Sequence, residues 1–312
     1  MLNRMSDVKL SIIICTYNRE SILSRSLQSL GKIIMPRDCN CELIIVDNNS
    51  KDNTKDIVSK FLNKPKFTTK YIYEGRQGKS FALNTGISAS RGEILVFTDD
   101  DVEFDKNWLV EIMKTFEEYN CAAIGGKIIA VFDTNKPKWM ITDTHFPFMS
   151  AIVNFDNGPS HCVLNRSPYG ANMAFKRSVF NDYGLFRTDI GPNNSNLMKG
   201  EDSEFCSRVR NKGIEIIYCP NAVVYHPVEP ERTKKQYFVS WYYNYGKYIV
   251  RTKIIPDNYN NIFNIPMWLV KECVIATFGW IICFNMNERF VKKLILSEVL
   301  GKMHESCFGG NS

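Results

Sequence analysis

The amino-acid sequence predicts an α/β fold, in which a mixed, mainly parallel sheet is flanked by helices and followed by an aromatic helical extension. Two observations carry this prediction. Apolar runs bounded by turn residues alternate with helix-like segments, and two runs, SIIIC and LIIV, are apolar throughout, which is typical of strands buried on both faces. A chain of 312 residues with 44% hydrophobic content can also build a substantial core.

The expected elements follow one another in regular order. The expected strands are residues 10–15, 43–46, 71–73 and 94–97, and the helices between them are residues 21–33, 53–62 and 80–89. The pattern then lapses into a polar and aromatic stretch, residues 133–168, which is too long for a plain connection. A second loop, residues 189–200, precedes an expected helix at 202–211 and two short strands at 215–218 and 222–225.

Charge and cysteine content exclude some classes of protein. The 39 Lys and Arg residues outnumber the 33 Asp and Glu residues, but no basic block typical of a nucleic-acid arm is present. A mildly cationic surface suits anionic small ligands or a membrane face. None of the ten cysteines forms a CxxC pair, and Cys39 and Cys41 are expected to point to opposite faces of a strand. We interpret all ten as free thiols of a cytoplasmic protein, since the first apolar run is too short for a signal peptide.

The C-terminal extension, residues 231–312, is heavily aromatic and apolar. Lys271 and Glu272 interrupt its longest apolar run and leave 12 apolar or small residues after them, too few to span a bilayer about 30 Å thick. One interpretation is an interfacial or re-entrant helix, flanked by Arg289, Lys292 and Lys293, in peripheral contact with the inner face of the cell membrane. The alternative is a helix packed on the rest of the chain or on a second subunit.

Polar residues directly follow three of the expected strands, at the sheet edge where ligands of parallel sheets bind. These residues are Thr16, Tyr17 and Arg19 after the first strand, Asp47 after the second, and Asp99, Asp100 and Asp101 after the fourth. We expect the three groups to line one crevice.

The acidic triplet at residues 99–101 repels itself unless a cation lies among its carboxylates. In extended backbone Asp99 and Asp101 point to one side and Asp100 to the other, so two carboxylates can share a divalent cation or divide between a cation and a sugar hydroxyl. All-oxygen ligation suits Mg²⁺ or Mn²⁺, and Mg²⁺ usually binds through carboxylates together with substrate phosphates. The alternative is a solvated acidic turn that caps a helix starting near Asn107.

The other strand ends offer contacts for a nucleotide. Asp47 can accept the imide N–H of a pyrimidine base, and its alternative role is a turn or a helix cap. Thr16, Tyr17 and Arg19 offer backbone groups, an aromatic wall and a cation to the same ligand.

The segment GRQGKS contains Arg76 and Lys79 but lacks the GxxxxGK[ST] spacing of a phosphate loop. We therefore reject a nucleoside triphosphatase. Both cations stay candidates for contacts to a diphosphate or a base, and solvated loop cations are the alternative.

Two later residues are candidates for chemistry. Asp202 lies at the expected start of a helix, where the dipole stabilises an ionised carboxylate, so it can serve as a general base. An ordinary N-cap is the alternative for Asp202. His226 follows the apolar segment AVVY and can bind a metal or a phosphate, whereas a structural histidine is the alternative.

The chain resembles the family 2 glycosyltransferases, which have the GT-A fold, over roughly residues 9–227. Five segments carry the resemblance in this order: SIIICTYNRE, LIIVDNNSKDNT, GKSFALNTGISASRGEILVFTDDD, PYGANMAFKRSVF and GEDSEFCSRVRNKG. It implies an inverting transferase that uses Mn²⁺ or Mg²⁺ and a nucleotide-sugar donor, with a UDP-sugar favoured.

The resemblance also implies roles for single residues. Asp47 would bind the base, Asp99 and Asp101 would form a DxD-type site for ribose and metal, Asp202 would be the catalytic base, and His226 would supplement the metal site. The remaining candidates would contact the donor: Thr16, Tyr17, Arg19, Arg76, Lys79 and Asp100.

The predicted function is transfer of a hexosyl or N-acetylhexosaminyl group to a hydroxyl of a glycan or lipid-linked glycan in bacterial surface-polysaccharide biosynthesis. Residues 1–230 would form the catalytic domain, with a nucleotide-sugar half at 1–132 and an acceptor half at 133–230, whose two long loops wall the acceptor site. Single addition is expected, because Trp241 lacks the glutamine and arginine of the processive QxxRW motif. The alternatives are a sugar-nucleotide nucleotidyltransferase and a non-catalytic scaffold subunit.

Overall fold

The computed structural model forms two compact units. One comprises Met1–Asp133, Ile152–Asn194 and Glu201–Pro227, and the other comprises Thr134–Ala151, Ser195–Gly200 and Val228–Ser312. The structure describes residues 8–62, 66–133, 136–137, 139–140, 150–192, 199–252, 261–262 and 265–309.

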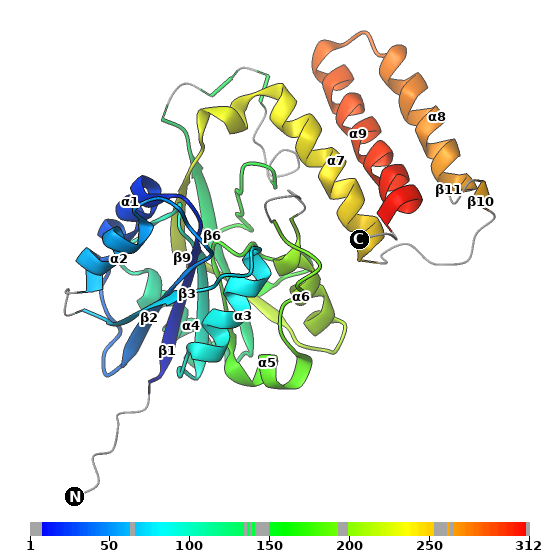
Figure 1. Ribbon diagram of the computed structural model, residues 1–312. Helices are drawn as coiled ribbons and strands as arrows, with labels where there is room; N and C mark the ends of the chain where they lie inside the picture. Colours follow the sequence, from blue (N-terminus) through cyan, green and yellow to red (C-terminus); the bar gives the residue numbers. More distant parts are fainter. Residues whose placement is uncertain are drawn as a thin grey trace, which may run out of the picture. The chain divides into compact units, whose positions relative to one another are not determined.

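The first unit is built on one mixed sheet (Figure 1). Among the described residues its strands lie in the order β3-β2-β1-β4-β8-β6-β9-β5, with β7 paired to β9. The four predicted strands are present and parallel, as β1 (Leu10–Thr16), β2 (Cys41–Asp47), β3 (Thr68–Tyr73) and β4 (Ile94–Asp99). The remaining strands are β5 (Glu103–Phe104), β6 (Ala123–Val131), β7 (Cys162–Val163), β8 (Met173–Lys176) and β9 (Ile216–Pro227). The predicted mixed, mainly parallel sheet is therefore confirmed in its N-terminal half, whereas β8 is antiparallel to both of its neighbours.

Helices flank this sheet as the alternating pattern predicted. They are α1 (Glu20–Leu30), α2 (Thr54–Leu62), α3 (Lys79–Ala89), α4 (Trp108–Tyr119), α5 (Arg177–Tyr183) and α6 (Glu201–Arg210). α1 connects β1 to β2 and α2 connects β2 to β3, so the chain moves in one direction along the sheet. α3 then connects β3 to β4 on the other side of β1. Because such crossovers are right-handed, α3 lies on the face of the sheet opposite to α1 and α2. β1 and β2 are buried almost throughout, as their apolar runs predicted.

The two short strands expected near the end of the first unit form one strand in the structure. The segments predicted as separate short strands at 215–218 and 222–225 belong to the single strand β9, whose pairing with β6 shifts register between Gly126 and Lys127. The shift is a β-bulge, and the buried side-chain amide of Asn172 donates to the carbonyls of Lys127 (2.9 Å) and Ala222 (2.7 Å) beside it. The side chain of Asn172 thus donates hydrogen bonds to backbone carbonyls that the interrupted strand pairing would leave without partners.

The cysteines are free thiols, as predicted. However, the sulfurs of Cys39 and Cys41 lie 3.4 Å apart, so the expectation that they point to opposite faces is wrong. Residues two apart along an extended segment share one face.

Long helices make up most of the described part of the second unit (Figure 1). α7 (Lys235–Arg251) and α8 (Met267–Ile281) both pack on α9 (Met286–Phe308), and a short 3₁₀ turn, η1 (Pro230–Thr233), precedes α7. Two short strands, β10 (Asn261–Ile262) and β11 (Ile265–Pro266), pair ahead of α8. Within the part of the chain that the structure describes, no helix combines the length and the apolar character needed to cross a membrane. The predicted domain boundaries stay predictions.

Candidate active site

The candidate site lies where the strand order of the sheet reverses. The chain leaves β1 for β2 on one side and later returns to β4 on the other side of β1. Ligands of open α/β sheets bind at such a switch point, beyond the carboxyl ends of the strands. The register places Thr16 beside Asp47 and Cys15 beside Asp99, and the half-buried Tyr17 follows Thr16. The structure thus brings the three predicted polar groups to one edge.

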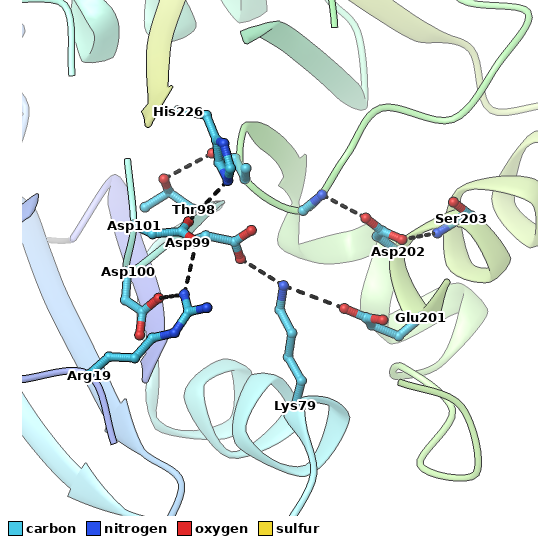
Figure 2. Close-up of polar contacts among 12 residues, drawn as sticks. Arg19, Lys79, Thr98, Asp99, Asp100, Asp101, Glu201, Asp202, Ser203 and His226 are labelled. Atoms are coloured by element: carbon cyan, nitrogen blue, oxygen red, sulfur yellow. Dashed lines mark hydrogen bonds and ion pairs between the residues drawn. The ribbon is translucent and has the colours of Figure 1, made fainter. Parts of the chain in front are cut away.

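Two cations of the chain itself contact the acidic triplet (Figure 2). Arg19 Nη1 donates to Asp100 Oδ1 at 3.0 Å and to Asp101 Oδ2 at 2.8 Å. Lys79 Nζ donates to Asp99 Oδ1 at 2.7 Å. All three carboxylates have a cationic partner, so their mutual repulsion is reduced, but two cations against three carboxylates leave the cluster with excess negative charge.

The alternative of a solvated acidic turn is wrong. Asp100 is buried, and this burial raises its pKa to about 6, against the opposing charge of Arg19 and with a further rise from Asp101. The N-cap position of α4 is Asn107, whose N–H donates to Asp105, so this helix begins beyond the triplet. The triplet is therefore part of the interior of the site.

Asp101 and His226 form a pair that fits a divalent cation. β5 pairs with β9 at Glu103 and Tyr225, which carries the buried His226 to the triplet. Its Nε2 lies 3.6 Å from Asp101 Oδ1 (Figure 2). Among the described residues no group of three or more His, Cys, Asp or Glu side chains is arranged to hold a metal. A carboxylate oxygen suits Mn²⁺ or Mg²⁺, and an imidazole nitrogen suits a transition metal such as Mn²⁺ better than Mg²⁺, if donor phosphates and water complete the coordination shell.

Asp202 lies in the first turn of α6, as predicted, and the backbone holds its carboxylate. Oδ2 accepts from the N–H of Gly170 at 2.8 Å and Oδ1 accepts from the N–H of Ser203 at 2.7 Å (Figure 2). Burial raises the pKa of Asp202 to about 6, the charge of Glu201 adds to the rise, and Lys79 opposes it. The sequence predicted stabilisation of the ionised form by the helix dipole, and here burial outweighs that effect. The result is a carboxylate that ionises just below neutral pH, which suits a general base.

Lys79 joins the two carboxylate groups of the site. Its Nζ lies 2.7 Å from Asp99 Oδ1 and 3.5 Å from Glu201 Oε1, so it stands between the triplet and the first turn of α6 (Figure 2). Burial lowers the pKa of Lys79, but Asp99, Glu201 and Asp202 together raise it well above its usual value. The alternative of a solvated loop cation is wrong for Lys79.

Asp47 is buried at the end of β2 and already has two partners. Oδ1 accepts from the N–H of Ser50 at 2.9 Å, which is the turn contact expected as its alternative role, and Oδ2 accepts from the hydroxyl of Tyr71 at 2.7 Å. Base binding by Asp47 stays a prediction. The sequence did not point to Tyr71, which becomes a neighbour only through the pairing of β2 with β3, where Tyr71 lies opposite Ile45.

The loop after β3 is held by residues that sequence reasoning missed. Arg76 is mostly exposed and forms a double hydrogen bond with Glu74, at 2.9 and 2.7 Å, which fits the alternative of a solvated loop cation, while its predicted contact with the donor stays a prediction. The buried Asn48 donates to the carbonyls of Glu74 and Arg76 and accepts from the N–H of Gly78 at 2.8 Å. The only sequence signal for Asn48 was its place beside Asp47. These contacts fix the loop that leads to Lys79.

Comparisons with known proteins identify the family and the fold. Residues 11–184 match the family described as Glycosyl transferase family 2. The chain is 25% identical over 294 residues to the succinoglycan biosynthesis protein ExoM of Rhizobium meliloti, covering 92% of this chain and 90% of that protein. It is 24% identical to the glucosyl-dolichyl phosphate glucuronosyltransferase of Haloferax volcanii, covering 78% and 77%. The structure resembles the mannosyltransferase PcManGT of Pyrobaculum calidifontis, solved with GDP-Man and Mn²⁺, with a TM-score of 0.64, 19% identity and coverage of 97% and 88%. This likeness confirms the predicted fold class.

Proposed function

The chain belongs to glycosyl transferase family 2, and we propose that it transfers a sugar from a nucleoside-diphosphate sugar to a hydroxyl group of a glycan, with Asp202 as the general base. The observation that carries this proposal is the environment of Asp202. A half-buried carboxylate with a pKa of about 6 lies across Lys79 from the acidic triplet. Such a group is ionised at neutral pH and basic enough to accept a proton from an attacking hydroxyl.

The reaction would be a single displacement. Asp202 takes the proton of the acceptor hydroxyl while the oxygen attacks the anomeric carbon and the bond to the diphosphate breaks. One in-line displacement inverts the configuration, so an α-linked donor gives a β-linked product. The hydrogen bonds from Gly170 and Ser203 support this role, because they fix both carboxylate oxygens before the acceptor arrives.

The donor would occupy the strand-end edge. Thr16, Tyr17 and Asp47 would contact the base, and Asp99 and Asp100 the ribose and diphosphate. Asp101 and His226 would hold Mn²⁺ or Mg²⁺, which neutralises the charge that develops on the leaving diphosphate. The Mn²⁺ and GDP-Man bound by the related mannosyltransferase support this type of donor, while UDP-linked hexoses and N-acetylhexosamines are our first candidates.

The acceptor would be a glycan or a lipid-linked glycan in polysaccharide biosynthesis. The names of the relatives from Rhizobium meliloti and Haloferax volcanii support this, because one refers to succinoglycan and the other to a glucosyl-dolichyl phosphate. The predicted acceptor walls, residues 133–168 and 189–200, lie partly outside the described residues, so their role stays a prediction. A lipid-linked acceptor would place the enzyme peripherally at the inner membrane face.

The test is release of nucleoside diphosphate from a panel of UDP-, GDP- and dTDP-sugars with Mn²⁺ or Mg²⁺ and a membrane extract as the acceptor source. Wild type should turn over one donor only with metal, Asp101→Ala and Asp202→Asn should lose turnover, and Asp202→Asn should keep nucleotide-dependent thermal stabilisation. The matched control is Glu204→Gln, on the same helix but paired with Arg208, which should keep activity.

Each of the other outcomes has a defined meaning. Pyrophosphate formation from a sugar phosphate and a nucleoside triphosphate would indicate a nucleotidyltransferase. Nucleotide binding without turnover of any donor would indicate a scaffold subunit. A product with retained anomeric configuration by NMR would contradict the single displacement.

A further inference from the structure

One face of α8 is apolar and points to solvent. Its large exposed side chains recur at helical spacing, so they form one stripe along the helix: Met267, Val274, Ile275, Phe278, Ile281 and Ile282. The opposite face carries the buried Leu269 and Ala276, and α8 packs on α9. A surface helix of a globular protein normally turns charged and polar residues outward, and α8 instead has apolar residues on both faces.

The stripe continues into the turn between α8 and α9 (Figure 1). Phe284 is 96% exposed and Met286 is 70% exposed. Together with Ile282, at the C-cap of α8, they form an apolar tip. A contiguous apolar patch of this kind on a protein surface marks a site that contacts another protein or a membrane.

Exposed cations lie within the stripe and beside the tip. Lys271 interrupts the stripe between Met267 and Ile275. Glu288 is an exposed carboxylate on the first turns of α9, where three further cations also lie: Arg289, Lys292 and Lys293. The guanidinium of Arg289 lies 5.6 Å from the ring centroid of Trp280, and a Cβ built at Gly279 would lie 3.8 Å from Lys292 Cδ. Both cations therefore lie along the last turns of α8. None of the four forms an ion pair with a carboxylate of the described residues.

We propose that the stripe, the tip and the four cations form a docking surface for a bilayer that contains anionic lipid. Apolar side chains would enter the acyl boundary while the cations contact headgroup phosphates, as in interfacial helices. α8 has 15 residues and is about 22 Å long, shorter than a hydrocarbon layer of about 30 Å, so it would lie in the interface. The charge favours this partner over a second copy of the chain, because paired stripes would bring four cations of like sign against four others.

This inference deepens the membrane contact of the proposed function, but its assay needs no catalysis. The full chain is mixed with vesicles of phosphatidylcholine alone or with phosphatidylglycerol, and bound protein is measured by flotation. The wild type should bind the anionic vesicles. The double variant Ile282→Ser/Phe284→Ser should bind at least about tenfold more weakly, since each buried side chain of this size contributes about tenfold to partition.

Two further variants separate the contributions. Lys292→Gln/Lys293→Gln should weaken binding to anionic vesicles by about fivefold for each charge removed and leave binding to neutral vesicles unchanged. Leu185→Ser removes an apolar side chain that is 42% exposed on the first unit, and it should bind like the wild type. Thermal unfolding should be unchanged in all variants, and vesicle binding is measured without a sugar donor, so a failure of the catalytic proposal would leave the vesicle result interpretable.

Three outcomes would overturn the proposal. The wild type fails to bind anionic vesicles, or Ile282→Ser/Phe284→Ser binds as well as the wild type. In the third, the wild type does not bind vesicles but self-associates in sedimentation, and Ile282→Ser/Phe284→Ser does not self-associate. That result would assign the stripe to a contact between two copies of the chain.

Discussion

Replacing Lys79 by glutamine should shift the pH dependence of transfer. The charge of Lys79 lowers the pKa of Asp202, so its loss should raise that pKa above its value of about 6. A Cβ built at Gly170 would lie 3.6 Å from Lys79 Nζ and 3.5 Å from Asp202 Oδ2, so these two atoms are at most about 7 Å apart. At an effective dielectric constant of about 20, two unit charges at this distance interact by about 2 kcal/mol. An energy of this size raises the pKa of Asp202 by more than one unit. The ionised fraction of Asp202 near pH 6 would then fall by about tenfold or more.

The assay is kcat/KM against pH at saturating metal. In the wild type, activity should fall about tenfold per pH unit below about 6, because only ionised Asp202 accepts the proton. In Lys79→Gln, activity at pH 6 should fall about tenfold further and recover at higher pH, whereas Lys79→Arg should keep the wild-type profile. A Lys79→Gln enzyme with an unshifted acid limb would refute the argument, even if its maximal rate were low.

Lys79→Gln should also lower the free energy of unfolding. Removing Lys79 leaves Asp99 and Glu201 without their shared cation, and because Lys79 and Asp99 are each 25% exposed, the loss should cost about 1 to 2 kcal/mol of the free energy of unfolding. The matched control is Arg76→Gln in the neighbouring loop, which removes an exposed cation and should change stability little. Denaturation at pH 8 compares the two.

Further variants test the packing. Gly246→Ala would force a methyl group onto the carbonyl oxygen of Glu298 where α7 meets α9, so it should cost about 2 kcal/mol in urea unfolding, whereas Gly279→Ala on α8 has room and should be neutral or slightly stabilising. Asn172→Ala should cost about 3 kcal/mol, because it leaves the indole N–H of Trp108 and two backbone carbonyls without partners; a loss below about 1 kcal/mol would contradict that reasoning.

Local pattern was sufficient to predict the N-terminal half of the sheet. β1 and β2 are continuous apolar runs, and a strand buried on both faces is the only short element that suits them in an alternating chain. β9 was divided in two because Pro220 and Asn221 interrupt its apolar residues, and the strand continues there through a bulge that Asn172 stabilises from another part of the chain. The sequence near residue 220 does not contain that information.

The same limit applies to the candidate site. Strand ends could be predicted to meet because parallel neighbours end at one edge, which grouped Thr16, Asp47 and Asp99. Which cation contacts which carboxylate depends on tertiary placement, since Arg19 reaches Asp100 and Asp101 from more than 80 residues away along the chain. The signal for Lys79 was equally weak, because lysines are mostly exposed in folded proteins.

The contacts of Arg19 and Lys79 answer the question raised by three consecutive aspartates. Two cations of the chain offset part of the negative charge of the triplet, so its carboxylates can stay in place before any ligand binds, and one negative charge remains for a metal to neutralise. Arg19 contacts Asp101 through Oδ2, whereas Oδ1 is the oxygen directed at His226. A divalent cation would therefore meet two protein ligands at one edge of the cluster and would gain most of its coordination from the diphosphate. Metal and donor should therefore bind together. The metal would then stabilise the negative charge that develops on the diphosphate as it leaves.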